Sequence, residues 1–182
     1  MRGVTSPSRR EVHDRALLDL EDGPVTPSNK AELSTVAGLL NVLLASLVVS
    51  SLQFEQHAQL VRGASLRPVA EFLHGCADRD RMSARLVATR IHQLGFPADH
   101  DPQHLTVRSQ VTFQGFADGR LDAVVTQDLV AVRILVQALQ EAARWVGDAD
   151  PTTRRLLEHL LAEKEAQADV LSAEMTRTTA HP

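Results

Sequence analysis

The 182-residue sequence has no tyrosine, a single cysteine and very few aromatic residues. The lone Cys76 excludes an intramolecular disulfide framework and fits a reducing compartment. With only 3% aromatic residues, a nucleic-acid module that stacks bases on its side chains is not expected. The net charge of −4 likewise argues against a general affinity for polyanions.

An apolar run long enough to cross a bilayer is also missing. The most apolar stretch, residues 36–50, contains Asn41 and small polar residues and is too short to span a membrane. The opening sequence MRGVTSPSRREVHD lacks the apolar centre of a secretory signal. We therefore expect a soluble, cytoplasmic protein without membrane contact.

Helical periodicity dominates the rest of the chain. Apolar residues recur with the period of an amphipathic helix in four long segments, which Gly, Pro and capping residues separate. The predicted helices cover about residues 34–62, 65–94, 118–146 and 151–177. Ser65 and Asp150 are the expected N-caps of the second and fourth helices. Asp118 or Gly119 begins the third.

The links between these helices are unequal. Short links join helices one to two and three to four, whereas residues 97–118 can run the length of a bundle and include a short helical turn near 102–109. This connectivity predicts an all-α four-helix bundle with one long crossover between helices two and three. The predicted parts are a flexible, disordered N-terminal arm (1–32), the bundle (33–178) and a tail (179–182).

The first predicted helix is apolar on two sides. One side carries Leu40, Leu43, Leu47 and Phe54. The opposite side carries Val42, Ala45, Val49 and Leu52. A helix with two apolar faces must bury both, so the second face predicts a contact with another subunit.

Four segments of the chain resemble the bacterioferritins and their mini-ferritin relatives. They are LNVLLASLVVSSLQFEQHAQLVRG (40–63), RLVATRIHQLGFPADHDPQHLTVRS (85–109), DLVAVRI (128–134) and GDADPTTRRLLEHLLAEKEAQADVL (147–171). The resemblance extends over residues 34–175 and includes all four helices in order. It implies a ferritin-like four-helix bundle, assembled into a hollow cage, from a family whose members oxidise and store iron.

Members of that family hold two irons with one glutamate on each of two helices and a Glu-x-x-His pair on each of the other two. The resemblance places these ligand positions at Leu47, Asp80, Ser83, Val132, Lys164 and Gln167. Helical counting independently puts all six on or beside an inward stripe. Only Asp80 keeps a metal-binding carboxylate. The resemblance therefore implies that the standard ferroxidase centre is lost, and neither a bound metal nor another cofactor is expected there.

Lys164 adds a positive charge where the family keeps a negative one. Because lysine is almost never fully buried without a partner, we expect Asp80 to be its counter-ion. Ser83 and Gln167 are expected to supply hydrogen bonds to this pair, while the two apolar positions seal the site.

Two further patterns are candidates for chemistry. The haem-binding methionine of bacterioferritins aligns with Arg81, and Met82 lies about 100° away around the helix, so haem is not expected. The loop sequence DHDPQH offers a candidate metal site, with helix capping as the alternative explanation. Its possible ligands are Asp99, His100, Asp101 and His104.

The N-terminal arm carries possible nucleic-acid contacts at Arg2, Arg9 and Arg10. Mini-ferritins that coat DNA often use basic tails, and phosphate contacts need only point charges. Acidic residues follow immediately in the sequence, which favours a solvated tail.

From these observations we expect a structural cage or dimer subunit rather than an enzyme. It forms homo-oligomers or assembles with an active ferritin paralogue. Two alternatives stay open at this level. One is iron storage or detoxification, with an oxidation site at a subunit interface or supplied by a partner. The other is DNA binding through the arm.

Overall fold

A computed structural model describes residues 6–61, 63–115 and 120–180. In these ranges every regular element is helical and no strand occurs. The long helices are α2 (Leu33–Leu60), α3 (Arg67–Gln93), α5 (Leu121–Val146) and α6 (Pro151–Ala180). The short elements are α1 (Arg9–Ala16), η1 (Leu20–Asp22), η2 (Ala64–Leu66) and α4 (Pro102–Arg108). The predicted all-α fold class is confirmed.

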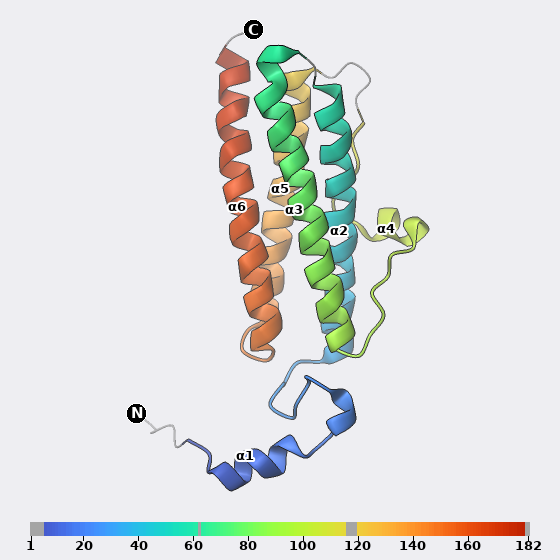
Figure 1. The fold of residues 1–182 in the computed structure, drawn as a ribbon, viewed down its shortest axis with the longest axis vertical. Coiled ribbons are helices and arrows are strands. Elements are labelled where there is room, and N and C mark those ends of the chain that lie inside the picture. The colour runs from blue at the N-terminus through green and yellow to red at the C-terminus, as the bar shows by residue number, and fades with distance from the viewer. Residues whose placement is uncertain (1–5, 62, 116–119, 181–182) are drawn as a thin grey trace.

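Two antiparallel hairpins, α2–α3 and α5–α6, pack side by side into the bundle (Figure 1). The chain leaves α3 at the end of the bundle that faces the N-terminal arm and returns to the other end before α5 begins. This long connection carries α4, which packs against α2. The single crossover between the second and third long helices is therefore as predicted.

Local sequence explains most helix boundaries. The Asp101 side chain caps α4 by accepting a hydrogen bond from the backbone N of Gln103 at 2.9 Å. At the start of α6, Asp150 Oδ1 accepts from the backbone N of Thr153 at 3.0 Å. The expected Ser65 cap is wrong, because the 3₁₀ turn η2 occupies that position and leads directly into α3.

The predicted starts of the third helix, Asp118 and Gly119, lie outside the described residues, and the described part of α5 begins at Leu121. The N-terminal arm, expected to be flexible and disordered, contains one short α-helix, α1. Ser8 and Glu11 form a capping box that starts α1. No residue of α1 is buried. Nearer the bundle, the backbone N of Lys30 donates to the carbonyl oxygen of Ala149 at 2.8 Å, which fixes the base of the arm beside the α5–α6 turn.

The second apolar face of α2 is largely covered by the chain's own crossover. Ala45 and Val49 are buried, and between them Ser46 Oγ accepts a hydrogen bond from the backbone N of Gln110 at 3.0 Å. Leu52 alone of the predicted face is strongly exposed, at 53%. The prediction that this whole face needs a second subunit is wrong, because the length of the crossover lets it lie along α2.

Of the helices in the described ranges, α2 is the one long and apolar enough to cross a membrane by length and composition. However, 56% of its most apolar window is buried inside the bundle. Its apolar character is accounted for by contacts with α3, α5 and the crossover. α2 is a core helix of the bundle.

Candidate functional site

All six predicted ligand positions point into the bundle. They lie on the four long helices, and none is more than 3% exposed. The buried set is Leu47, Asp80, Ser83, Val132, Lys164 and Gln167. Because each falls on the apolar stripe of its helix, packing of the stripes turns all six toward the core, where Leu47 lies in one apolar cluster and Val132 in the other.

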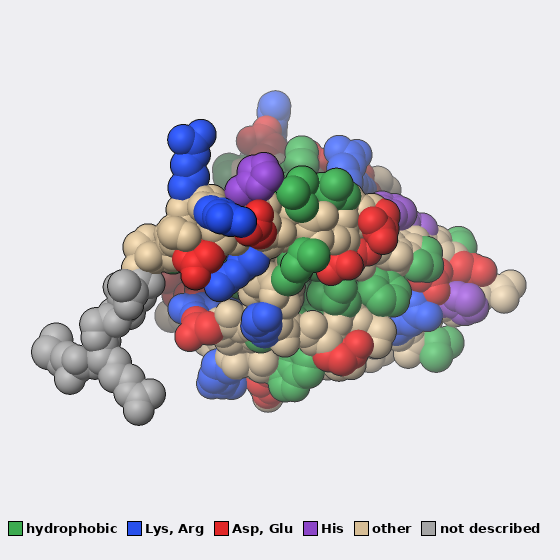
Figure 2. Space-filling view, turned by 90° about the horizontal axis from the view of Figure 1, so that it is seen from below, with side chains coloured by type: hydrophobic (Ala, Val, Ile, Leu, Met, Phe, Trp, Pro, Cys, Tyr) green, Lys and Arg blue, Asp and Glu red, His purple; other side chains and the backbone are tan. Residues whose placement is uncertain are grey.

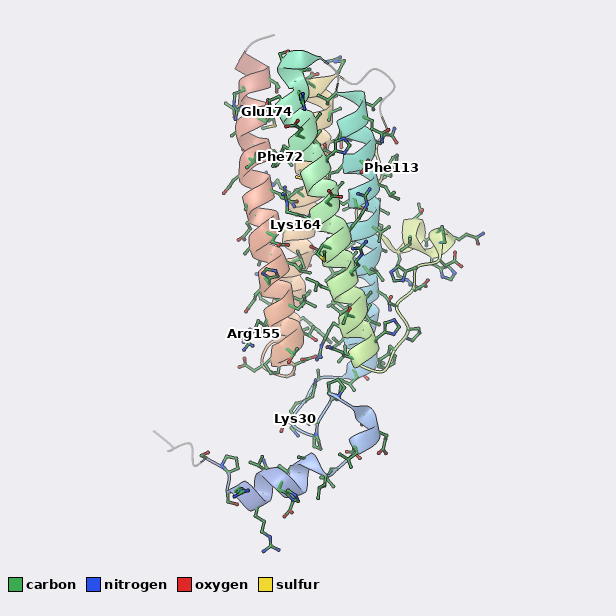
Figure 3. All side chains as sticks on the ribbon, in the orientation of Figure 1. Lys30, Phe72, Phe113, Arg155, Lys164 and Glu174 are labelled. Carbon is green, nitrogen blue, oxygen red and sulfur yellow. The ribbon has the colours of Figure 1, made fainter. Side chains whose placement is uncertain are left out.

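The fully buried ammonium of Lys164 is the centre of this site. Its Nζ contacts Asp80 Oδ1 in a salt bridge between α6 and α3. Nζ also donates to Gln167 Oε1, one turn along α6, at 2.8 Å. Figure 3 shows Lys164 between these two helices. The predicted pairing with Asp80 and the hydrogen bond to Gln167 are confirmed.

Ser83 does not take the role expected of it. Its Oγ lies 3.4 Å from Glu163 Oε2 rather than against the ammonium. Lys164 is adjacent to Glu163 in sequence but points about 100° away from it around α6. Ser83 therefore contacts Glu163, which points away from the core, and does not contact Lys164, which points into it.

This arrangement stabilises a buried charge but presents few metal ligands. Among the described residues, no group of three His, Cys, Asp or Glu side chains is placed to hold a metal ion. Asp80, the remaining carboxylate of the six positions, is already paired with a cation.

A second buried polar cluster lies between α2 and α5. Asp128 Oδ1, on α5, accepts a hydrogen bond from Gln53 Nε2 at 3.0 Å and lies 2.8 Å from His57 Nδ1. All three side chains are essentially inaccessible to solvent. From its sequence position we expect His57 at the edge of the bundle, and this expectation is wrong.

Gln53 and His57, both on α2, also form hydrogen bonds with the backbone of the crossover at Gln114. Gln53 Oε1 accepts from the backbone N of Gln114 at 2.9 Å, and His57 Nε2 lies 2.7 Å from the carbonyl oxygen of Gln114. The four-residue spacing of Gln53 and His57 on α2 was visible in the sequence. Nothing in the sequence marked Asp128 or Gln114 as their partners, because both lie more than 50 residues away.

The hydrogen bonds around His57 determine the charge of this cluster. A carbonyl oxygen can only accept, so Nε2 carries a proton and donates to Gln114. Nδ1 then either donates to an ionised Asp128 or accepts from a protonated one, and the pair is neutral in both forms. Burial, the largest cause, raises the pKa of Asp128, with a smaller contribution from the negative charge of Asp80, while His57 and Gln53 oppose the rise.

A further buried ion pair connects α3 to the start of α6. Arg90 Nη2 donates to both oxygens of Asp150, at 2.9 and 2.8 Å, and Arg90 Nε donates to Thr153 Oγ1 at 2.8 Å. Although burial alone would raise the pKa of Asp150, hydrogen bonds from Thr153 and Arg90 hold it below its usual value. This network lies at the end of the bundle and fastens α3 to the first turn of α6.

Comparison with known proteins identifies the family of this helical bundle. Residues 37–180 match the family model described as Ferritin-like domain. The chain belongs to this ferritin-like family. The match includes all four long helices and the three buried clusters between them.

Solved structures show the same fold at low sequence identity. A dodecameric thioferritin from Bacteroides fragilis, a bacterioferritin-related protein, has a TM-score of 0.79 and 23% identity, over 83% of this chain and 90% of its own. The Dps protein of Vibrio cholerae O1 has a TM-score of 0.73 and 17% identity, over 78% and 89%. DpsC of Streptomyces coelicolor has 0.73 and 22%, over 77% and 83%. No curated protein sequence matches the chain.

The remaining candidate residues of this ferritin-like chain lie outside the core, except Cys76. Burial raises the pKa of the Cys76 thiol to about 11, as expected of a structural cysteine. Met82 is 53% exposed, and Arg81 Nη2 donates to Glu55 Oε2 at 2.8 Å on the outer surface of α2 and α3. Neither residue at the haem-related positions points into the bundle.

The acidic loop forms the start of α4. Asp99 accepts hydrogen bonds from the backbone N of Asp101 at 3.0 Å and from Arg108 Nη1 at 2.6 Å, and lies 2.9 Å from His104 Nδ1. These contacts, the Asp101 backbone first, lower the pKa of Asp99 to about 2. His100 is exposed. The carboxylates are thus engaged in capping, and a loop metal site stays a prediction.

The possible nucleic-acid contacts in the arm are only partly described. Arg2 lies outside the described residues. Arg9 and Arg10 are exposed, and Arg10 Nε lies 3.9 Å from Asp14. Figure 2, which views the molecule from below, shows basic and acidic side chains intermingled on this face. This mixture is the pattern of a solvated surface rather than of a uniform basic patch.

Proposed function

We propose that this ferritin-like chain is a structural subunit of a cage or dimer that lacks a standard ferroxidase centre. It assembles with copies of itself or with an active ferritin. The observation that carries the proposal is the buried ammonium of Lys164 on Asp80, at a position where the family resemblance implies a carboxylate ligand.

Electrostatics support this interpretation. A ferrous ion in this part of the core would lie close to the Lys164 ammonium, and like charges repel strongly where water cannot screen them. Moving Lys164 aside would leave its charge without the compensation that Asp80 provides. Leu47 and Val132 cannot coordinate a metal, and the buried carboxylate on α5, Asp128, is already paired with His57.

Exposed apolar residues on α2 and α3 support assembly. Leu52 and Met82 are each 53% exposed and Leu86 is 39% exposed, on two helices that pack against each other. Exposed apolar side chains on two neighbouring helices favour a subunit contact. The dodecameric state of the similar Bacteroides fragilis protein is consistent with such an assembly.

Iron oxidation by the pure protein tests the loss of the ferroxidase centre. The protein is loaded with Fe(II) without oxygen and then exposed to oxygen while Fe(III) formation is followed by absorbance. We expect the rate of the protein-free control and no saturable fast phase. A fast phase that saturates at a fixed number of irons per subunit would contradict the proposal.

Two variants sharpen this experiment. Lys164→Met removes the cation without adding a ligand and should stay inactive. A variant that restores the family ligands at all six positions should gain a fast phase, because it replaces the buried cation by carboxylates and imidazoles. Inactivity of Lys164→Met separates loss of ligands from simple blockage by lysine.

Native mass spectrometry tests the assembly. We expect a homo-oligomer, or a mixed oligomer when an active ferritin is co-expressed. Leu52→Glu combined with Met82→Glu should lower the oligomer mass, whereas Val170→Glu, at a similarly exposed position on α6, should not. A monomer under all these conditions would contradict the structural role.

A further inference from the structure

The N-terminal arm carries large apolar side chains that its own chain leaves uncovered. Four of them, in α1 and directly after it, are between 52% and 66% exposed: Val12, Leu17, Leu18 and Leu20. A helix as short as α1 is only marginally stable in water unless it packs against another surface. Exposed apolar side chains gathered in one short segment therefore indicate that the arm docks on a partner.

A groove of matching character lies on the face formed by α2 and α5. It has a volume of about 390 Å³, and its apolar walls include Leu39 and Val42 on α2 and Ala138 and Trp145 on α5. Trp145 is the single tryptophan of the chain, and it is 55% exposed. A tryptophan beside an apolar groove is a frequent anchor of a protein contact.

The charges of the arm and of this α2–α5 groove are complementary. Among the described residues, Glu141 is the one charged side chain that lines the groove. Its hydrogen-bond partner, Gln137, is neutral and leaves the negative charge in place. The sequence of α1, RREVHDRA, contains three arginines and two acidic residues. A docked α1 can therefore place an arginine beside Glu141, which favours this pairing of surfaces.

The attachment of the arm favours a second copy as the source of the docked helix. A hollow between the arm and the end of α3 is lined by residues 21–25 and 92–95 together with Leu33. Val25 also packs against the apolar core. These contacts hold the later part of the arm at the end of the bundle, and α1 lies clear of its own long helices (Figure 1). The α1 helix is thus presented to a neighbouring molecule.

We propose that α1 of one copy docks in the α2–α5 groove of a second copy. Its apolar side chains cover Trp145, and its arginines lie beside Glu141. The proposal rests on the self-assembly stated under the proposed function and adds the segment and the surface that make one of the contacts. The exposed residues Leu52, Met82 and Leu86 do not line this groove, so the two contacts can be removed separately.

The fluorescence of the single tryptophan measures docking in the full-length protein. In Val12→Glu combined with Leu17→Glu, Trp145 should become more exposed than in the wild type. We expect emission at longer wavelength and a larger acrylamide quenching constant. Both substituted residues are exposed, so the bundle keeps its fold, which circular dichroism checks. Val170→Glu, the same change at an exposed position on α6, is the matched control and should leave the wild-type fluorescence unchanged. Equal fluorescence in wild type and arm variant would overturn the proposal.

A mixed oligomer distinguishes the arm of a second copy from the arm of the same chain. The arm variant is co-expressed with Trp145→Phe, and oligomers that contain both are purified through two different tags. All the tryptophan signal then comes from the arm variant, and every intact arm comes from the other chain. We expect emission and quenching to move back toward the wild-type values. No recovery would assign the docking to the same chain and overturn the proposal.

Native mass spectrometry of the same samples separates this inference from the proposed function. An oligomer whose tryptophan fluorescence does not depend on the arm would refute the arm contact alone. A wild-type protein that is a monomer, alone and beside an active ferritin, would refute both.

Discussion

The two buried ion pairs between α3 and α6 differ in how completely their polar atoms are used. Arg90 and Asp150, at the end of the bundle, form a bidentate pair, and Asp150 also caps the first turn of α6. Lys164 and Asp80, in the middle of the bundle, make a single contact. The other oxygen of Asp80 has no hydrogen-bond partner in the part of the chain that the structure describes.

The difference follows from the side chains and their locations. The planar guanidinium of Arg90 matches a carboxylate with two parallel bonds, whereas the ammonium of Lys164 acts as a point charge. The Arg90 pair stabilises the junction between α3 and the start of α6, and a helical bundle needs such junctions. The Lys164 pair lies where the family resemblance places a metal site.

The largest effect is expected from breaking the central pair on one side. Asp80→Ala leaves the Lys164 ammonium buried without a counter-ion, which should reduce the free energy of unfolding by about 3 to 5 kcal/mol. Chemical denaturation followed by circular dichroism measures the change. A loss below about 1 kcal/mol, the size found for exposed ion pairs, would show that the pair is not buried in solution.

A smaller loss is expected at the end of the bundle. Asp150→Ala removes the cap of α6 and the partner of Arg90, which should reduce the free energy of unfolding by about 2 to 3 kcal/mol. Arg90 is buried too, but it keeps its hydrogen bonds to Thr153 and Gln93 when Asp150 is removed. The same denaturation measurement, made beside Asp80→Ala, ranks the two pairs. A larger loss for Asp150→Ala would reverse the comparison.

Acid should weaken the terminal pair. The pKa of Asp150 is lowered in the folded chain, so its contribution to stability is complete above the unfolded value of about 3.9 and is lost as pH falls through the folded value. We expect part of the acid-induced fall in melting temperature below pH 4 to disappear in Asp150→Asn. Identical pH profiles for wild type and variant would contradict this assignment.

The smallest effect is expected from removing both partners of the central pair. Asp80→Leu with Lys164→Met replaces the ion pair by apolar side chains and should leave the free energy of unfolding within about 1 kcal/mol of the wild type, or raise it. The contrast with Asp80→Ala is the decisive result. If the double variant is as unstable as the single one, the loss arises from packing rather than from charge.

The sequence predicted the four helices and the inward direction of all six candidate positions, because helical periodicity is a local property. It also predicted the Lys164–Asp80 pair, since a lysine on an apolar stripe needs a counter-ion and the family resemblance places Asp80 at a facing ligand position. The cluster of Gln53, His57 and Asp128 was not predicted. Its partners lie 71 to 75 residues apart, and their meeting depends on the packing of α2 against α5.

The amino-acid sequence by itself thus determined the helices, their order and the kind of side chain at each inward position. Only the tertiary structure decided which polar groups share those contacts. Ser83 bonds to Glu163 instead of Lys164, and the crossover covers the face of α2 that suggested a second subunit. The physical reason is that a helix repeats every 3.6 residues along one chain, whereas hydrogen bonds between helices depend on how their axes are spaced and aligned.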